Sequence, residues 1–341
     1  MISNTISSCW SELTTNKYHL TLVILIFSLI TLAVSWYKSA AKPTFPSPPG
    51  PRGLPVVGYL PFLGVNLHHQ FTKMAQHYGP IFKLNLGSKI HIVISSSELA
   101  EVVLREQDDV FANRDPPAAA IDLSHGGQTI VWSNNNSHWR NMRKVLVHEV
   151  LSSKNLEASH TFRRVEVGKT VKRVYETIGT EVDLGRIMFV SSLNVVTSMI
   201  WGNSLVDGEK RNDLGVELRE VLSKIVELVG TANVSDFFPV VSRLDLQGIV
   251  REMKRQRTVV EAIFDTIINE RMASKGEEAI EREGRKDFLQ ILLELKEQNT
   301  FNTTKIKALF MDTILGATDT TSTMVEWIMA ELLRHPKSSP D

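Results

Sequence analysis

The sequence predicts a mainly α-helical protein with a small β-sheet, preceded by a helix long enough to cross a membrane. Three observations predict it: an uncharged apolar run at residues 18–37, a period-two alternation at residues 81–94, and helical spacing of apolar residues after Trp139. The 341 residues include one cysteine, and basic and acidic residues balance at 38 each. This composition excludes a disulfide scaffold and a cysteine-rich metal site, and it provides no basic field for a nucleic-acid partner.

Residues 18–37, YHLTLVILIFSLITLAVSWY, are the predicted transmembrane anchor. About twenty helical residues span the ~30 Å hydrocarbon core of a bilayer, and aromatic residues stand at both ends of the run, as interfaces favour. Lys38, Lys42 and Arg52 follow it, so the positive-inside rule places the rest of the chain in the cytosol. The alternative interpretation is a cleaved signal peptide.

A hinge rich in proline and glycine follows at residues 38–58. Each proline fixes φ and lacks an N–H donor, so the run cannot form a helix or a central strand. It is typical of a semi-rigid spacer between an anchor and a globular body. A proline-rich ligand for an SH3-type domain is the other interpretation.

The body begins with a predicted hairpin and continues as helices. Residues 81–86 alternate, Gly87-Ser88 is a turn, and residues 91–94 resume the alternation. Residues 108–137 are rich in Pro, Gly, Asn and Ser and predict a long loop. The charge-dense stretch 271–287 is expected to be a solvated connection. Helices are predicted near residues 139–150, 157–178, 185–201, 212–230, 248–274, 287–298 and 303–335.

The first motif with chemical potential is WRNMR, residues 139–143. Trp139 and Arg143 are four residues apart, so their side chains share a helix face. A planar guanidinium beside an indole N–H suits a carboxylate or a phosphate. The alternative is a core anchor that happens to lie beside a surface charge.

The second motif is LGATDTTST, residues 315–323, in the middle of the predicted helix 303–335. A single buried stripe is predicted along that helix, formed by Ile306, Leu309, Phe310, Thr313, Ile314, Ala317, Thr321, Met324, Ile328, Met329, Leu332 and Leu333. Gly, Thr, Asp and Ser oppose helix propensity at its centre. Two interpretations stay open: small residues that admit a ligand and polar ones that relay protons, or a Ser/Thr patch that packs against a neighbouring helix.

An anchor, PPGPRGLPVVG, YGPIFKLNLG, FANRDPP, WRNMR and GATDTTS occur in this order, and DFFPVVSRLDLQGI lies at residues 236–249. Each motif is modest alone, but the ordered set is highly specific. From residue 18 to residue 336 the chain resembles the cytochrome P-450 superfamily of haem-thiolate monooxygenases, and more closely its plant microsomal A-type group.

The resemblance implies a haem cofactor and names the residues that contact it. Trp139 and Arg143 match the pair that binds a haem propionate, and the long helix matches the one that crosses the distal face of the haem. Gly316 and Ala317 match the small pair beside the oxygen-binding groove, where the family usually has glycine at the second position. No metal-ligating residue is assigned.

The resemblance also implies the reaction and its participants. Asp319 and Thr320 match the acid–alcohol pair that delivers protons during oxygen activation, and residues 111–130 match the segment that lines the substrate pocket. The implied reaction is hydroxylation of a small apolar plant secondary metabolite, a terpenoid or a phenylpropanoid/flavonoid, with O2 and NADPH. An NADPH-cytochrome reductase is the implied electron donor.

The implied location is the endoplasmic-reticulum membrane, crossed once, with the catalytic part facing the cytosol. The domain organisation expected on this basis is a lumenal N-terminus at residues 1–17, a transmembrane anchor at 18–37, a Pro-rich hinge at 38–58 and an incomplete catalytic domain at 59–341.

The chain is expected to be a C-terminally truncated member that holds the N-terminal two-thirds of the P-450 fold. Members of the family continue well beyond this length, to a Cys loop that supplies the thiolate ligand of the haem iron. The one cysteine here is Cys9, which precedes the anchor, so the thiolate ligand is absent from this chain. We therefore expect the chain to be inactive as given. The alternative function is that of a non-catalytic, membrane-anchored fragment or pseudogene product.

Overall fold

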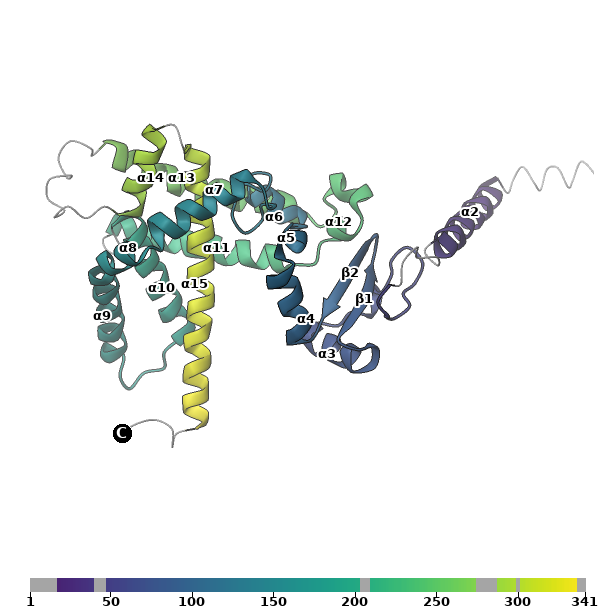
Figure 1. Cartoon of the computed structure of the whole chain (residues 1–341), viewed down its shortest axis with the longest axis horizontal. Coiled ribbons are helices and arrows are strands. Elements are labelled where there is room, and N and C mark those ends of the chain that lie inside the picture. Colours follow the sequence, from purple (N-terminus) through teal and green to yellow (C-terminus); the bar gives the residue numbers. More distant parts are fainter. Residues whose placement is uncertain (1–16, 40–46, 203–208, 274–286, 299–300, 336–341) are drawn as a thin grey trace, which may run out of the picture. The chain divides into compact units, whose positions relative to one another are not determined.

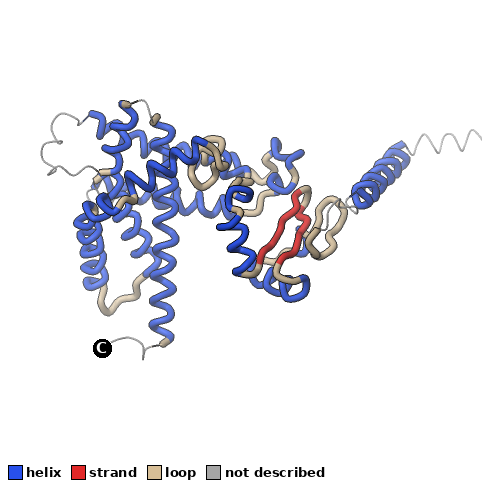
Figure 2. Tube along the Cα trace, in the orientation of Figure 1, coloured by secondary structure: helices blue, strands red, loops and turns tan. Residues whose placement is uncertain are grey.

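A computed structural model describes residues 17–39, 47–202, 209–273, 287–298 and 301–335 of the chain (Figure 1). These residues form helices and one two-stranded antiparallel sheet (Figure 2), which confirms the predicted fold class. The chain divides into two compact units. The first is Met1–Phe111 with Phe237–Val240, and the second is Ala112–Asp236 with Val241–Asp341. The division into four segments expected above remains a prediction.

The first unit contains the sheet and the short helices around it. Its elements are α2 (Lys17–Ser39), the 3-10 turn Leu60–Phe62, α3 (Leu67–Tyr78), β1 (Ile81–Leu86), β2 (Lys89–Ile94), α4 (Ser97–Glu101), the π-helical turn Val102–Glu106 and α5 (Asp108–Phe111).

The predicted hairpin is present. Ile81 pairs with Ile94 and Leu86 with Lys89, so β2 begins two residues earlier than the sequence pattern indicated. Alternate residues of β1 point inward, and the small core of this unit is formed by Met74, Phe82, Leu84 and Leu86. Alternation therefore identified the buried face of β1 correctly.

The described part of the hinge packs against β1. The N–H of Lys83 donates to Pro49 O (2.9 Å), and the N–H of Tyr59 donates to Asn85 O (2.7 Å). Gly58 has φ +62°, and a Cβ on it would lie 2.1 Å from Asn85 O, so only glycine fits there. From residue 47 onward the run is thus an edge segment of the sheet rather than a free spacer, while residues 40–46 lie outside the described residues.

α2 covers the predicted anchor, and every described side chain from Thr21 to Leu32 is exposed. Among the described residues, α10 (Leu184–Trp201) is the one helix long and apolar enough to cross a membrane, because the apolar stretch described in α2, Thr21–Val34, is shorter. Leu193 and Ile200 of α10 are fully buried, as in the core helix of a globular protein. The transmembrane assignment of α2 therefore stays a prediction.

The second unit is helical. Its elements are α6 (Ala118–Leu123), α7 (Ser137–Val145), the π-helical turn Leu146–Val150, α8 (Ser153–Ala158), α9 (His160–Glu176), α10, α11 (Glu209–Gly230), α12 (Val234–Phe237, whose last residue belongs to the first unit), the 3-10 turn Pro239–Leu244, α13 (Ile249–Ala273), α14 (Phe288–Glu297) and α15 (Thr303–Arg334). The solvated connection expected at residues 271–287 lies mostly outside the described residues.

Several of these helices begin where a capping side chain stands in the sequence. Asn136 accepts from Trp139 N, Asp183 from Arg186 N, Asp287 from Gln290 N and Asn302 from Lys305 N. Each contact satisfies one backbone N–H that the first turn of a helix leaves without an internal partner. For this reason α7, α10, α14 and α15 start close to the predicted positions.

The core of the second unit lies between helices that are distant in sequence. α10 packs along α15 and against α9 and α14, while α6 and α11 pack against α13 (Figure 1). Phe310 of α15 is fully buried at the centre. Its ring centroid lies 5.6 Å from that of Trp201, 5.5 Å from that of Phe264 and 6.3 Å from that of Phe288.

The buried stripe predicted along the whole of α15 is wrong for its C-terminal part. Buried residues lie between Ile306 and Ser322, and within this range Thr321 of the predicted stripe is exposed. Beyond Ser322 the large apolar side chains are exposed, with 61% of Met324, 65% of Trp327 and 77% of Leu333 accessible. No described element covers these side chains, so helical periodicity alone did not indicate burial.

The long loop predicted at residues 108–137 is also wrong in part, because α5 and α6 lie within it. α6 follows Pro117 and starts with three alanines, which are the best helix formers. Ala119, Ala120 and Leu123 are buried, and α6 packs against α13. Burial against a distant helix thus stabilises a turn of helix that composition indicated as loop.

Candidate functional site

Trp139 and Arg143 lie one turn apart on α7, as predicted. Asn136 caps the helix by accepting from the Trp139 backbone N–H at 2.9 Å. The guanidinium carbon of Arg143 lies 5.3 Å from the centroid of the Trp139 ring, which is cation–π geometry. Arg143 is exposed, and among the described residues no carboxylate pairs with it. The pair therefore presents a cation supported by an aromatic face.

The indole N–H of Trp139 is already engaged. It donates to the carbonyl oxygen of Ile130 at 3.1 Å. Indole has a single donor and no acceptor, so in this arrangement Trp139 has no further hydrogen bond to give. Of the two residues, Arg143 is the one with donors left for a ligand.

The centre of α15 has two different faces. Thr318 and Ser322 are buried, and their hydroxyls donate to Ile314 O (2.8 Å) and Asp319 O (2.9 Å). These bonds to the helix's own carbonyls satisfy the hydroxyls inside the core. Thr318 and Ser322 therefore pack inside the core, which agrees with the interpretation of the motif as a packing patch.

The opposite face of α15 carries the predicted site residues. Gly316, Asp319 and Thr320 are exposed, and Ala317 is partly buried. A Cβ added to Gly316 would meet no atom within 4 Å, so open space lies beside the backbone there. The Thr320 hydroxyl donates to Gly316 O at 2.7 Å. Small and polar residues thus share one accessible face, and a ligand site on this face stays a prediction.

Asp312 is a functional candidate that sequence reasoning missed. It lies on α15 one turn before Gly316, and its Oδ2 accepts the N–H of Ile130 at 2.5 Å. Burial raises its pKa to about 7, against the opposing effect of the Ile130 N–H, the Val131 N–H and the Thr129 side chain, which face the carboxyl group. The available signal was a lone acid within the apolar run LFMDTIL.

Segment 129–131 therefore connects the α7 residues with α15. The N–H of Ile130 bonds to Asp312, and the carbonyl of Ile130 accepts from Trp139. Trp139 of α7 and Asp312 of α15 are thus linked through a peptide that neither motif includes.

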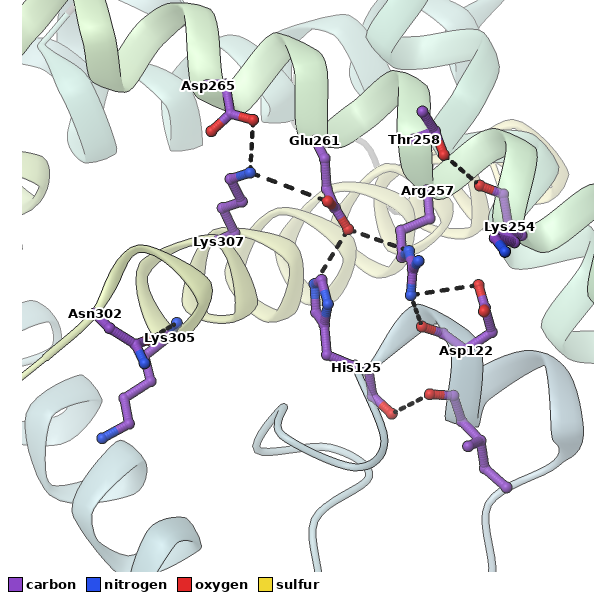
Figure 3. A network of polar contacts seen from close by, with 12 residues as sticks. Asp122, His125, Lys254, Arg257, Thr258, Glu261, Asp265, Asn302, Lys305 and Lys307 are labelled. Carbon is purple, nitrogen blue, oxygen red and sulfur yellow. Dashed lines mark hydrogen bonds and ion pairs between the residues drawn. The ribbon is translucent and has the colours of Figure 1, made fainter.

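A second polar network contacts Asp122 and His125, which precede segment 129–131 in the sequence (Figure 3). Arg257 Nη1 donates to Asp122 O at 2.6 Å. Glu261 lies between three cationic or polar groups, with His125 Nε2 and Arg257 Nε at 3.2 Å each and Lys307 Nζ at 4.0 Å. Residues from α13, from α15 and from the turn after α6 therefore meet at one partly buried carboxylate.

The charge state of His125 follows from this setting. Burial lowers the pKa of His125, and the charge of Glu261 opposes that effect. This setting favours the uncharged imidazole. The network joins α13 to α15 through Lys307, which pairs with Glu261 and Asp265, and it joins α13 to α6 through Arg257 and Asp122. We interpret the network around Glu261 as structural.

The structure shows no additional metal-binding arrangement in its described parts. Within them, no three His, Cys, Asp or Glu side chains are grouped so that they could hold a metal ion. Cys9, the one cysteine of the chain, lies outside the described residues.

The chain is similar to known proteins. The family model Cytochrome P450 matches residues 48–339. A 7-ethoxycoumarin O-deethylase of Helianthus tuberosus is 36% identical over 319 residues, which cover 92% of this chain and 63% of that protein. Flavonoid 3'-monooxygenase CYP75B137 of Crocosmia x crocosmiiflora is 35% identical over 321 residues, covering 92% of this chain and 61% of that protein.

A solved zebrafish cytochrome P450 structure with progesterone matches with a TM-score of 0.63 at 20% sequence identity, covering 80% of this chain and 61% of that one. At that identity the likeness shows the fold, so the fold expected from the resemblance is confirmed. The chain spans about 60% of the length of the two curated relatives, 63% and 61%.

Proposed function

Because this chain belongs to the cytochrome P450 family, we propose that it forms the haem-binding part of a monooxygenase that hydroxylates a small apolar plant secondary metabolite with NADPH and O2. The observation that carries the proposal is the accessible face of α15, where Gly316 leaves open space beside Thr320. The names of the two relatives support an aromatic substrate such as a phenylpropanoid or flavonoid. A terpenoid remains the other class implied by the resemblance.

The residues present fit a haem, which is a flat apolar ring with two carboxylates. Gly316 adds no side chain to the face on which the ring would lie. Arg143 offers a planar fork of N–H donors that matches a propionate, and Trp139 supports it through the cation–π contact. The Trp139 N–H itself is available to a propionate only if it leaves Ile130. When bound, haem supplies the oxidative chemistry, while the protein provides orientation and electrostatics.

We assign proton handling to Thr320 and Asp319. The Thr320 hydroxyl holds its proton on Gly316 O, and a rotation about χ1 would turn the O–H away from the helix toward the open space. Asp319 is the preceding residue and is exposed, so its carboxylate can exchange protons with water. Gly316 and Ala317 have little or no side chain, so they leave space for a ligand beside that part of the helix.

We place the protein at the endoplasmic-reticulum membrane, with α2 as a single-pass anchor and the helical body in the cytosol. The exposed apolar side chains of α2 and the basic residues that follow residue 37 support this arrangement. An NADPH-cytochrome reductase is the proposed electron donor, since the reaction consumes electrons from NADPH. Residues 111–130 are the proposed lining of the substrate pocket.

Arg143→Gln tests the proposed propionate contact. A charge-assisted hydrogen bond contributes about 1.5–3 kcal/mol, so we expect haem affinity to fall about tenfold or more in a Soret titration of the chain in lipid nanodiscs. Arg140→Gln is the matched control, because Arg140 is exposed on the same helix and donates to Asn135 Oδ1 at 3.3 Å. Equal losses in both variants, or no loss in Arg143→Gln, would contradict the assignment.

The 341-residue chain is expected to give no thiolate-type Soret band when haem is added, reduced and exposed to carbon monoxide. Its one cysteine, Cys9, precedes α2, whereas the proposed haem face lies on α7 and α15. The absorption spectrum of the reduced carbonyl complex checks this. A Cys9→Ser variant serves as the control, and a thiolate band that disappears in it would show that Cys9 does reach the haem.

A further inference from the structure

We propose that Asp312 is a positioning residue, which fixes segment 129–131 on α15 and, through Ile130, holds the indole of Trp139. The inference concerns contacts within this chain. Its importance for a haem rests on the proposed function, because only there does Trp139 support a cofactor contact.

The contacts form a continuous path with Ile130 at its centre. The N–H of Ile130 donates to Asp312 Oδ2 at 2.5 Å, and the carbonyl of the same residue accepts the Trp139 Nε1–H at 3.1 Å. Trp139 in turn lies 5.3 Å from the guanidinium carbon of Arg143. A shift of Ile130 therefore moves the acceptor of Trp139, and so the ring on which Arg143 rests.

The neighbours of Ile130 also act on the Asp312 carboxyl group. The backbone N–H of Val131 and the Thr129 side chain both lower its pKa, so the whole of segment 129–131 faces this carboxyl group. The hydrogen bond itself comes from the Ile130 N–H.

Asp312 has no other evident task. No charged side chain is among the groups that shift its pKa, so within the described chain it does not serve as half of an ion pair. Burial keeps water away from the Asp312 carboxyl group, and this destabilises its charged form. An acid retained in an apolar helix face, with only backbone and hydroxyl donors around it, is explained by the segment that it holds.

The direction of the pH effect follows from the raised pKa. Burial lifts the pKa of Asp312 from 3.8 to about 7. If segment 129–131 detaches and water reaches the carboxyl group, the pKa returns toward its ordinary value, so the attached arrangement binds a proton more tightly. Attachment is therefore strongest below about pH 4, weakens as the pH rises toward 7, and is constant above that.

Two histidines near the segment must be separated from this effect. His138 Nε2 lies 2.9 Å from Gln128 O, and His125 pairs with Glu261 at 3.2 Å. Each is adjacent to the segment without contacting Asp312 in any described bond. Variants that remove each imidazole therefore act as controls.

The test follows the Trp139 indole N–H by NMR in the haem-free chain, with Trp139→Phe to assign its signal. In the wild type we expect the chemical shift to titrate with a midpoint near pH 7. Asp312→Asn should shift the signal and remove the titration. Glu331→Gln, a neutralised acid at an exposed position of α15, should titrate like the wild type, as should His138→Gln and His125→Gln.

A wild-type signal that does not titrate would overturn the proposal, even if Asp312→Asn failed to fold. So would a titration that persists in Asp312→Asn or that vanishes in either histidine variant. Because haem is absent throughout, this outcome is independent of the Arg143→Gln titration. The two experiments can therefore contradict the positioning role of Asp312 without contradicting haem binding, or contradict haem binding without contradicting the positioning role.

Discussion

Gly316→Leu is expected to abolish or weaken haem binding by at least tenfold while leaving the protein folded and slightly more stable. Gly316 is helical and exposed, and a Cβ there meets no atom within 4 Å, so a side chain can leave the backbone without a clash at its first carbon. Replacing a helical glycine gains about 0.5–1 kcal/mol of stability. The new side chain would occupy the space that the ring requires. Soret titration and urea denaturation measure the two effects separately.

Gly168→Leu is the matched control for this experiment. Gly168 is an exposed glycine of α9, and a Cβ on it also meets nothing within 4 Å. We expect the same gain in stability and no change in haem affinity. If Gly316→Leu bound haem as the wild type does, the accessible face of α15 would not be the haem site.

Phe310→Ala is expected to cost about 3–5 kcal/mol of unfolding free energy, as for a phenylalanine removed from a packed core. Phe310 is fully buried, with aromatic rings at 5.5 and 5.6 Å. The control is Trp327→Ala on the same helix, because the Trp327 side chain is 65% exposed. That change should stay within about 0.5 kcal/mol, the usual range for surface positions.

Urea denaturation followed by circular dichroism measures both variants. Phe310→Leu, with an expected cost of about 1 kcal/mol, provides a folded reference if the alanine variant is too unstable to study. Similar losses at Phe310 and Trp327 would mean that the C-terminal part of α15 is packed, against the exposure described above.

How much the sequence could predict depended on whether the signal was local. The starts of α7, α10, α14 and α15 were predictable because Asn136, Asp183, Asp287 and Asn302 cap helices that follow them directly. The inward side of β1 was predictable from alternation. In each case the deciding contacts lie within a few residues.

Asp312 could not be predicted in the same way. Its described partner, Ile130, is 182 residues away in the sequence, and that partner's donor is a backbone N–H with no side-chain signature. Tertiary structure alone brings them together. The exposure of Trp327 is similar, because an apolar pattern does not indicate whether a neighbouring element lies over it.

Residues of the single motif 315–323 lie on two different faces of α15. Thr318 and Ser322 satisfy their hydroxyls within the helix and pack, whereas Gly316 and Thr320 stand on the accessible face. The sequence presented these as competing interpretations. The helical period of 3.6 residues separates them onto opposite sides, so the packing of Thr318 and Ser322 is compatible with a ligand site at Gly316 and Thr320, which stays a prediction.

Hydrogen exchange of the 341-residue chain with and without haem shows whether α7 and α15 together form a haem site. We expect slower exchange on haem addition in peptides covering residues 137–145 and 313–323, and no change in α9 or α3. Slowing spread evenly over the chain, or confined to other helices, would contradict the account.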